Sequence, residues 1–406
     1  EVLKYFLATI STQRPRNSGR ILGVSVGPAS AWTLPNTRNI SGLSRSMSVE
    51  GPEDAVQPPA DIDDIERLAM AKLSPEVRAF IQTGTGRGLT VRENRQAFER
   101  WRFLPKVMSR TPKRSTETTL LGRPVSMPVG IAPTAAHCIV HPDAESAVAK
   151  AASAARTVMA VSVVHSVPLE AVAAAAGPDA LLWAQLDIRK ERSLTLEDAL
   201  RAQRCGCAAL VVTLDAPLIG RKAAPGIVDP VSKAFGETFR RLRGGTAGSE
   251  WDPCQSWDDI DKIRDAVDLP IVLKGILRVD DALEAVKHGV SGIVVSNHGG
   301  LYMDGVPATL DVLPAVVEAV GDRCEVYMDG GVRSGVDVVK ALALGARAVF
   351  IGRPVLYGLG YRGQQGVTDV LEFFRRELDN CLALIGCNDV NKVNAGFLTR
   401  TGGYYP

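Results

Sequence analysis

The sequence lacks a pattern of paired cysteines. Its seven cysteines are odd in number, and no two of them form a C-x-x-C pair. A disulfide framework and a zinc site are therefore not expected, and no metal is predicted. Free thiols in apolar stretches are typical of a reducing compartment. The cysteines are Cys138, Cys205, Cys207, Cys254, Cys324, Cys381 and Cys387.

The chain also lacks a charge excess of either sign and any long apolar run. Lys plus Arg number 47 and Asp plus Glu 45 among 406 residues, a formal net charge of +2. This balance gives no electrostatic footprint for nucleic acid. No apolar run approaches the roughly 20 residues of a membrane-spanning helix. The expected partners are a small-molecule substrate and either further copies of the chain or other subunits of a complex.

Acidic residues are absent from the start of the chain. Between Val2 and Val49 there is none, whereas the same stretch has six basic residues and eight serines. An Arg- and Ser-rich segment of this kind resembles an organelle-targeting leader or its remnant. We therefore expect an organellar, preferably mitochondrial, location, with the cytoplasm as the alternative. The other interpretation of this basic arm is a docking strap on the protein surface.

Three segments are predicted along the chain: the basic arm at residues 1–60, a catalytic-type domain at 61–395 and a tail at 396–406. Residues 50–60 are polar and Pro-rich, as linkers are. Residues 61–82 show helical spacing of apolar side chains, so a helical segment should precede the main domain.

Short runs rich in Val, Ile and Leu recur from residue 129 onward, each followed by a segment of helical length. This alternation predicts an α/β protein with a parallel sheet, and eight such units favour a (β/α)8 TIM barrel. A doubly wound open sheet is the competing architecture, but no G-x-G-x-x-G follows the first strand. The runs are residues 129–132, 158–164, 181–186, 209–214, 270–273, 292–296, 325–328 and 348–351.

The interval between the fourth and fifth runs, 209–214 and 270–273, is longer than the others. The excess, roughly residues 218–256, is polar and Gly-rich. Long insertions after barrel strands commonly cover active sites, so a lid is expected here, with a plain surface loop as the alternative.

Two Gly-rich turns follow the last two strands, at residues 329–333 (DGGVR) and 352–354 (GRP). Glycine allows backbone N–H groups to approach an anion, and Arg333 and Arg353 offer charge-assisted hydrogen bonds. The loops after strands seven and eight are the usual phosphate site of a barrel. We therefore predict that a phosphate group binds here.

Three ionisable residues end neighbouring strands. His298 follows the sixth run in Ser296–Gly300 (SNHGG), Asp215 ends the fourth run, and Lys274 ends the fifth. A His in the barrel mouth can act as a general base, a carboxylate can orient it, and a cation can stabilise negative charge. A structural, hydrogen-bonded His is the plainer alternative.

Taken together, these segments resemble the FMN-dependent 2-hydroxy acid oxidase and dehydrogenase family over about residues 62–390. The matching stretches include Glu93–Phe98 (ENRQAF), Ile131–Ala135 (IAPTA), Val212–Arg221 (VTLDAPLIGR) and Val295–Gly300 (VSNHGG). The resemblance implies a TIM barrel with FMN across its mouth. It implies His298 as the base that takes the substrate hydroxyl proton, with Asp215 in support. It implies a cofactor-binding set of Ser162, Gln185, Thr213, Lys274, Ser296, Asp329, Gly331, Arg333, Gly352 and Arg353.

The substrate positions depart from the family pattern. Leu301 stands where the family has an Arg that holds the substrate carboxylate, and Phe80 and Asp187 stand where it has tyrosines. Lys222 replaces an auxiliary Arg. An ammonium lacks the planar fork of a guanidinium, and Asp187 would repel an anion. A simple 2-hydroxy acid is therefore a poor candidate substrate.

Three functions remain open at this point. The first is an FMN oxidoreductase that acts on a CH–OH group of another kind of substrate. The second is a catalytically impaired family member that serves as a structural subunit of a larger assembly. The third is an ordinary 2-hydroxy acid oxidase with a different anion clamp.

Overall fold

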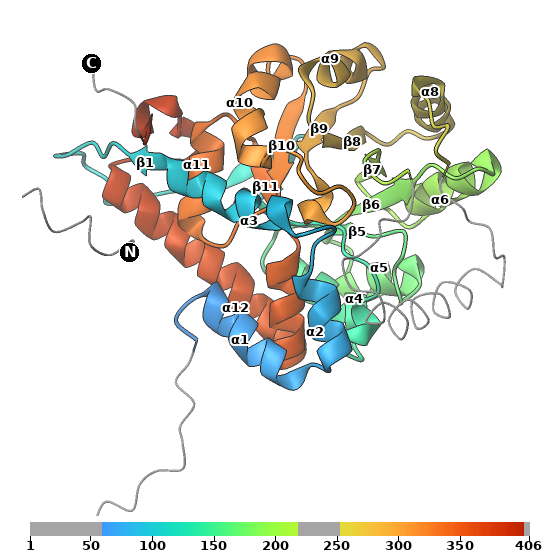
Figure 1. The fold of residues 1–406 in the computed structure, drawn as a ribbon, viewed down its shortest axis with the longest axis horizontal. Coiled ribbons are helices and arrows are strands. Elements are labelled where there is room, and N and C mark those ends of the chain that lie inside the picture. The colour runs from blue at the N-terminus through green and yellow to red at the C-terminus, as the bar shows by residue number, and fades with distance from the viewer. Residues whose placement is uncertain (1–58, 218–251, 402–406) are drawn as a thin grey trace, which may run out of the picture. The chain divides into compact units, whose positions relative to one another are not determined.

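The computed structural model describes residues 59–217 and 252–401, which belong to one compact unit spanning residues 57–406. Within it eight parallel strands form a closed barrel in the order β10-β11-β4-β5-β6-β7-β8-β9 (Figure 1). The predicted TIM barrel and all eight of its strands are confirmed. The strands are β4 (Val129–Ile131), β5 (Val158–Val161), β6 (Leu181–Asp187), β7 (Ala209–Thr213), β8 (Ile271–Ile276), β9 (Gly292–Val295), β10 (Glu325–Asp329) and β11 (Ala348–Ile351).

Both faces of these strands are buried, which is why they read as continuous apolar runs and not as alternating ones. One set of side chains packs outward against the helices. The other set fills the barrel, where the rings of Trp183, Tyr327 and Phe350 lie 5.4–5.7 Å apart. These three aromatic residues close the lower interior, so any ligand must bind nearer the carboxyl ends of the strands.

Helices surround the barrel, and each barrel strand is followed along the chain by one of them. They are α4 (Ala144–Ala154), α5 (Leu169–Ala176), α6 (Arg192–Arg204), α8 (Trp257–Ala266), α9 (Val279–Lys287), α10 (Thr309–Val320), α11 (Gly335–Ala343) and α12 (Arg353–Ile385). Helix α12 bends sharply at Arg362 and Gly363, where the backbone leaves the helical region. Its first turns therefore form a separate short helix directly after β11.

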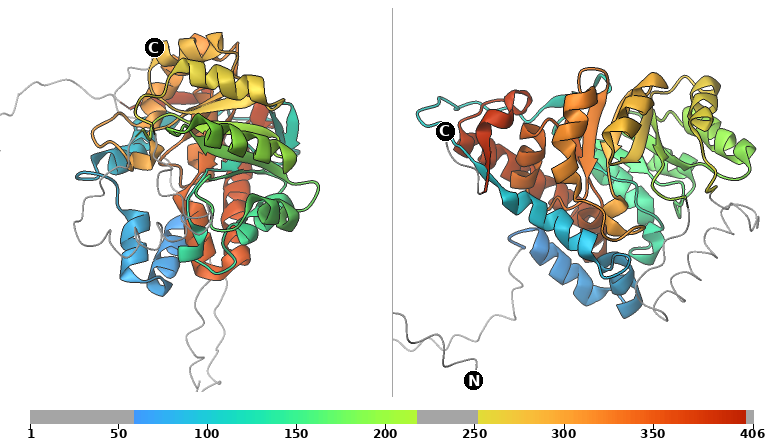
Figure 2. Two further views of the ribbon diagram at one scale, coloured as in Figure 1. Left: turned by 90° about the vertical axis from the view of Figure 1, so that its right-hand side faces the viewer. Right: turned by 45° about the horizontal axis from the view of Figure 1, so that its top comes forward.

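The predicted helical segment before the barrel is confirmed, and it consists of two helices. Helix α1 (Ile62–Lys72) ends at Leu73, and α2 (Pro75–Gln82) begins at Pro75, whose ring fits the first helical position but not a helix interior. Helix α1 packs against α12, as both figures show (Figures 1 and 2). Helix α3 (Leu89–Gln96) follows and passes beside the turn after β9.

Four short strands complete the fold. The hairpin of β2 (Thr118–Leu120) and β3 (Arg123–Val125) packs Leu120 and Val125 onto the inner cluster, which closes the amino end of the barrel. Strand β12 (Leu398–Arg400) pairs antiparallel with β1 (Trp101–Phe103). The first residues of the predicted tail therefore belong to the folded unit.

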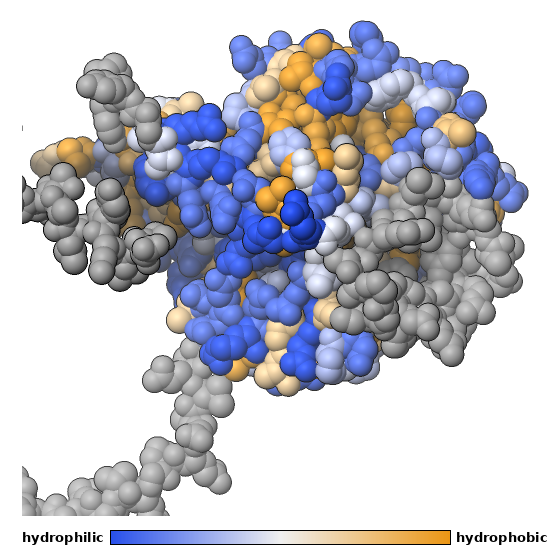
Figure 3. Space-filling view, viewed as in Figure 1, coloured by the Kyte–Doolittle hydropathy of each residue, from blue (hydrophilic) through white to orange (hydrophobic). Residues whose placement is uncertain are grey.

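Hydrophilic residues cover much of the face over α1 to α3, whereas apolar residues gather over α9 and α10 (Figure 3). No helix among the described residues has the length and apolarity needed to cross a membrane. Residues 1–58 of the basic arm and residues 218–251 of the predicted lid, with Lys222, lie outside the described residues, so the roles of arm and lid stay predictions.

Candidate active site at the carboxyl ends of the strands

The two-residue period of the strands brings the polar residues of the predicted site to the inner face of the barrel. Side chains two residues apart share a face of a strand, and the inner cluster includes Ala160, Trp183, Val211, Val272, Val294 and Tyr327. Two positions beyond each of these lies a polar residue near the carboxyl end of the same strand. The six residues are Ser162, Gln185, Thr213, Lys274, Ser296 and Asp329, all buried. One further step along β6 brings Asp187 to the same face.

His298 and Asp215 form the centre of this mouth. The His298 ring Nδ1 lies 3.0 Å from Asp215 Oδ1. Burial alone raises the pKa of Asp215, but the Lys274 ammonium and His298 outweigh burial, so that the pKa is lowered and the carboxyl is ionised. Nδ1–H then donates to Asp215, which leaves the Nε2 lone pair open to accept a proton. The His298 side chain is 24% exposed, so a substrate can reach it.

The backbone around His298 and Asp215 has conformations that allow neighbouring groups to approach closely. Gly275 has φ +108°, and a Cβ there would lie 2.6 Å from the side chain of Asp215. His298, Gly299 and Gly300 all have positive φ, at 54°, 60° and 75°. A non-glycine residue in this region is uncommon and often marks a functional position. The turn places the imidazole over the end of β7. It also reverses the chain direction, so that the following residues return toward the imidazole.

Lys274 is a buried cation among carboxylates. Its side chain is 4% exposed, and its Nζ lies 3.7 Å from Asp329 Oδ2, too far for a good hydrogen bond. Burial lowers the pKa of Lys274, but the charges of Asp215, Asp329 and Asp187 raise it more, so the ammonium is retained. Ser296 Oγ donates to Asp329 Oδ1 at 2.6 Å, which fixes that carboxylate. The Nζ itself has no hydrogen-bond partner among the described residues.

Gln185 connects the strands on the other side of the mouth. Its Nε2 donates to Thr213 Oγ1 at 3.0 Å and to Asp187 Oδ1 at 2.8 Å, and its Oε1 accepts from the Val163 N–H at 2.9 Å. Ser162 Oγ accepts from the Val164 N–H at 3.1 Å. These contacts hold the polar side chains predicted to face a flavin ring.

The two arginines of the Gly-rich turns lie together. Arg353 Nη1 donates to the Gly299 carbonyl at 3.1 Å, and its Nε donates to the Ile81 carbonyl at 2.8 Å. Burial, and then the charge of Arg333, lower the pKa of Arg353. Within residues 59–217 and 252–401, the buried atoms Arg333 Nε and Arg353 Nη2 have no hydrogen-bond partner. Two neighbouring half-buried arginines, each with a buried open donor, indicate an anion site at the start of α12.

Gly331 has a packing role that sequence analysis did not foresee. Its φ is +85°, and a Cβ would lie 2.0 Å from the Asn94 carbonyl oxygen in α3. Gly352 differs, because the nearest atom to its Cβ position is a Thr134 methyl carbon at 3.5 Å. The first glycine is therefore required by the contact with α3, whereas Gly352 leaves space above the turn.

These residues fit FMN. Buried donors without partners normally cost about 1–3 kcal/mol each, so their clustering needs an explanation. The open donors of Lys274, Arg333 and Arg353 lie on β8 and after β10 and β11. A phosphate would satisfy the arginines, and the polar edge of a flavin ring would satisfy the Lys274 ammonium. No group of three His, Cys, Asp or Glu side chains suited to a metal occurs in the described ranges.

Tyr302 is a site residue that sequence analysis missed. Its ring lies edge-on to the His298 imidazole, with centroids 4.5 Å apart and planes at 67°. Burial, together with the charges of Asp187 and Asp215, raises the pKa of the phenol, so the hydroxyl stays protonated. The only signal in the sequence was an aromatic residue four positions after His298. Its importance depends on the turn that brings its ring back to the imidazole.

The positions expected to bind substrate do not all lie at the same distance from the barrel mouth. Asp187 lies in the mouth, beside Gln185. The Leu301 N–H donates to the His298 carbonyl at 3.3 Å, so Leu301 is part of the same turn. Phe80 lies in α2 and packs partly buried against the apolar core, one residue before the carbonyl that binds Arg353. The structure therefore places Asp187 and Leu301 directly at the mouth and Phe80 at its border.

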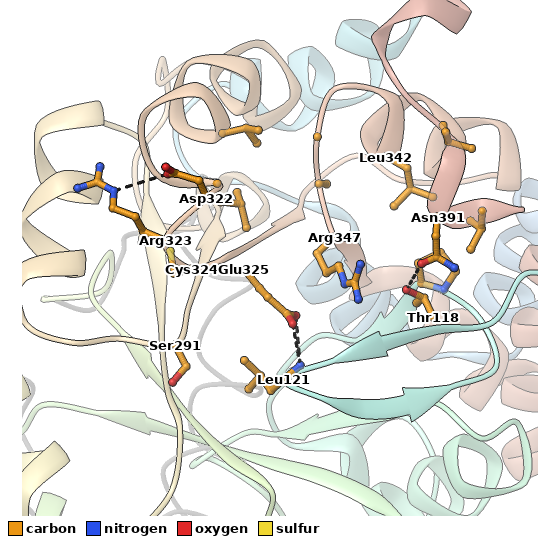
Figure 4. Close-up of a pocket in the computed structure, with 18 of the residues that line it drawn as sticks. Thr118, Leu121, Ser291, Asp322, Arg323, Cys324, Glu325, Leu342, Arg347 and Asn391 are labelled. Atoms are coloured by element: carbon orange, nitrogen blue, oxygen red, sulfur yellow. Dashed lines mark hydrogen bonds and ion pairs between the residues drawn. The ribbon is translucent and has the colours of Figure 1, made fainter.

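A separate pocket of about 700 Å³ lies at the amino end of β10 (Figure 4). Its charged groups are engaged: the Leu121 N–H donates to the Glu325 carboxylate at 3.2 Å, and Arg347 Nε donates to the Thr119 carbonyl at 2.8 Å. This pocket is at the end of the strand opposite to Asp329. It is therefore remote from the polar mouth and has no part in the candidate chemistry.

Comparisons with known proteins agree with this geometry. The family model described as FMN-dependent dehydrogenase matches residues 69–400. Mouse 2-hydroxyacid oxidase 1 is 42% identical over 356 residues, covering 82% of this chain and 94% of its own. L-lactate oxidase from Nostoc sp. is 38% identical over 361 residues, covering 85% and 99%. A crystal structure of mandelate oxidase superposes with a TM-score of 0.75 at 37% identity, covering 84% of this chain and 98% of that one.

Proposed function

Because the chain belongs to the FMN-dependent dehydrogenase family, we propose that it oxidises a CH–OH group, with His298 as the base. Its cofactor is FMN. The relatives named above are oxidases of 2-hydroxy acids, lactate and mandelate. Their identities of about 40% support the reaction type more strongly than they support any one substrate.

We assign separate roles in cofactor binding and proton transfer to the residues of this chain. Arg333 and Arg353 would hold the phosphate of FMN, and Ser162, Gln185, Thr213 and Lys274 would face its ring system. When bound, FMN supplies the acceptor for the two electrons and the hydrogen of the substrate C–H bond. His298 Nε2 takes the hydroxyl proton as the carbonyl forms, because Asp215 fixes Nδ1 as the donor nitrogen. Asp215 also stabilises the imidazolium that results.

The substrate we propose is an alcohol other than a simple 2-hydroxy acid. Leu301 and Phe80 offer no charge or hydrogen bond to a carboxylate, and Asp187 adds a negative charge in the mouth. A carboxylate substrate would therefore lose a bidentate contact and meet repulsion. This departure concerns only the substrate, since the residues proposed for FMN and for proton transfer are in place.

The single observation that carries the proposal is the 3.0 Å contact between His298 and Asp215 beneath a solvent-accessible imidazole. A purely structural subunit has no need to hold an accessible imidazole with one nitrogen open. The alternative of a structural subunit is therefore less well supported.

The test is the variant His298→Asn. Asn tolerates positive φ better than most residues, so the backbone turn should survive. We expect the variant to retain FMN and to lose about 10²–10⁴-fold in the rate of flavin reduction by any substrate of the wild type. An unchanged reduction rate would show that His298 is not the base.

A further inference from the structure

The proposed mechanism leaves the hydroxyl of Tyr302 without a role, although the ring lies beside the base. The Tyr302 ring is edge-on to the His298 imidazole, with the two centroids 4.5 Å apart. The charges of Asp187 and Asp215 both act on the phenol, so it lies near the carboxyl ends of β6 and β7. A substrate whose hydroxyl reaches His298 therefore brings its neighbouring groups close to this phenol.

The loop that carries this ring is fixed by hydrogen bonds to the segment before α3 and to the start of that helix. The Thr85 N–H donates to the Gly300 carbonyl at 2.9 Å. The Asp304 carboxylate accepts from the N–H groups of Arg87 and Thr90, both at 2.9 Å. A phenol that the fold holds in place loses little conformational freedom when a ligand binds, which favours binding.

The Tyr302 hydroxyl is a neutral donor that is open to a ligand. Burial, together with the charges of Asp187 and Asp215, raises the pKa of the phenol, so the proton is kept at neutral pH. Within residues 59–217 and 252–401, the hydroxyl makes no hydrogen bond. Enclosed polar groups are normally hydrogen-bonded, so a partner from the substrate is expected.

The charged donors of the mouth are assigned to the cofactor and not to the substrate. The open donors of Lys274, Arg333 and Arg353 all fit FMN. The side chain of Leu301 offers no donor, and its N–H is used within the turn. Among the described residues on the substrate side of the mouth, the hydroxyl of Tyr302 is the side-chain donor that remains.

One neutral donor suits a neutral carbonyl group of the substrate. A carbonyl oxygen that leaves water needs a hydrogen bond to offset the loss, and a phenol hydroxyl supplies one. An ionised carboxylate loses far more hydration and is normally held by charged donors, often by a bidentate guanidinium. An apolar group would leave the phenol hydroxyl without a partner. Of the three groups, the neutral carbonyl fits best.

We propose that the Tyr302 hydroxyl donates a hydrogen bond to a neutral carbonyl oxygen next to the carbinol of the substrate, which is therefore a 2-hydroxy amide. This inference rests on the proposed oxidation of a CH–OH group and adds the substrate class. In the reaction the hydroxyl proton passes to His298 Nε2, and the carbinol hydrogen passes with two electrons to FMN. The product is a 2-oxo amide, whose carbonyl oxygen keeps the hydrogen bond from Tyr302.

Three small alcohols with the same carbinol test the proposal. Lactamide bears an amide, lactate bears a carboxylate, and 3-methyl-2-butanol bears an isopropyl group of similar size. Each is added anaerobically to the FMN-loaded full chain. The perturbation of the flavin spectrum gives the dissociation constant, and its bleaching gives the reduction rate. We expect lactamide to bind most tightly and to reduce the flavin fastest.

Tyr302→Phe is the principal variant, because it removes the hydroxyl and retains the ring beside His298. We expect it to weaken binding of lactamide about 3- to 10-fold, as for the loss of one neutral hydrogen bond. Binding of 3-methyl-2-butanol should change by less than about twofold, since an apolar group makes no such bond. Equal losses for both alcohols would show that the ring packing, and not the hydroxyl, is responsible, and would overturn the inference.

Tyr361→Phe is the matched control. It removes a phenol hydroxyl from α12, where the ring lies 5.0 Å from Lys72 Nζ and away from the barrel mouth. The ratio of the dissociation constants for lactamide and 3-methyl-2-butanol should stay at the wild-type value in this variant. A change of that ratio as large as in Tyr302→Phe would contradict a specific role for Tyr302.

The outcomes separate this inference from the proposed function. Tightest binding and fastest bleaching with lactamide, both dependent on the Tyr302 hydroxyl, support both. Bleaching with a preference for lactate or 3-methyl-2-butanol overturns the inference and leaves the oxidation standing. Binding of lactamide that depends on the hydroxyl but gives no bleaching supports the site and contradicts the proposed function. If lactamide does not bind, or binds Tyr302→Phe as tightly as the wild type, the inference is overturned.

Discussion

The barrel mouth has two halves that differ in where their residues come from. The flavin half consists of Ser162, Gln185, Thr213, Lys274, Ser296, Asp329, Arg333 and Arg353. The substrate half consists of Phe80, Asp187, Leu301 and Tyr302. The flavin half lies on strand ends and the turns that follow them, whereas the substrate half is drawn mainly from α2 and from the loop after β9. The resemblance found in the sequence predicts that the first half keeps the family pattern and that the second departs from it.

The difference has a physical basis. Residues on the inner face of a barrel share neighbours with every adjacent strand, so changing one disturbs several contacts. Lys274 is an example, since three carboxylates act on it. Loop residues such as Leu301 make fewer packing contacts and can be substituted with little effect on the fold. We expect substitutions in the two halves to have separable effects, which Lys274→Met and Leu301→Arg test. Asp215→Asn tests the base that both halves need, and Asp304→Asn tests the loop that carries Leu301.

The largest effect is expected for Asp215→Asn. An amide cannot stabilise the imidazolium and no longer fixes Nδ1 as the donor, so the rate of flavin reduction should fall about 10²–10⁴-fold. Flavin content should stay near that of the wild type, because the contact of Asp215 is with His298. Rapid-mixing absorbance measures both quantities. A variant that reduces its flavin at the normal rate would remove Asp215 from the mechanism.

Lys274→Met tests the flavin half directly. Removing the one ammonium leaves buried carboxylates without compensation, which should cost about 3–5 kcal/mol in the free energy of unfolding and weaken FMN binding. Denaturant titration and flavin fluorescence on dilution measure these losses. Lys287→Met is the control, because its pair with Glu284 is exposed to solvent and should contribute little to stability. Similar losses for both variants would contradict the special place of Lys274.

Leu301→Arg tests the substrate half. A guanidinium in the turn beside His298 should pair with a substrate carboxylate and raise kcat/KM for lactate about 10- to 100-fold, equivalent to one or two charged hydrogen bonds. Met303→Arg places the same charge on a 67% exposed position of the same loop and should change little. If Leu301→Arg gives no gain, alone or with Phe80→Tyr, the missing clamp does not explain the substrate preference.

The smallest effect is expected for Asp304→Asn, and it depends on pH. Hydrogen bonds from the N–H groups of Thr90 and Arg87 lower the pKa of Asp304 to about 2. A depressed pKa in the folded state stabilises the protein above the ordinary carboxyl pKa of about 4 and loses this effect as pH falls toward 2. Wild type and variant should therefore differ in denaturant midpoint at pH 7, and the difference should shrink below pH 4 and disappear only as the pH falls through about 2. A difference that is constant with pH would contradict this assignment.

The sequence allowed the barrel to be predicted because each strand has the same local signal. Runs such as 209–214 and 348–351 are apolar on both faces and are followed by a helix, so each unit can be recognised without its neighbours. The break between α1 and α2 depended on Pro75, which the apolar spacing alone obscures. The pairing of β12 with β1 could not be predicted, because strands of three residues carry too little pattern.

The candidate site was predictable where a residue follows a strand and not where it depends on a turn. His298, Asp215 and Lys274 could be placed from their positions at strand ends. Tyr302 could not, because three consecutive positive φ angles bring it back to the imidazole. Gly331 was linked to phosphate, while its contact with Asn94 requires knowledge of where α3 passes.

The most direct test of the difference between the halves is the visible spectrum of the purified protein during anaerobic addition of glycolate, lactate and mandelate. We predict that the protein contains FMN, as the intact flavin half requires, and that the flavin stays oxidised with all three acids. Rapid bleaching by any of them would contradict the altered substrate half, because it would show that the mouth accepts a 2-hydroxy acid without the Arg at position 301.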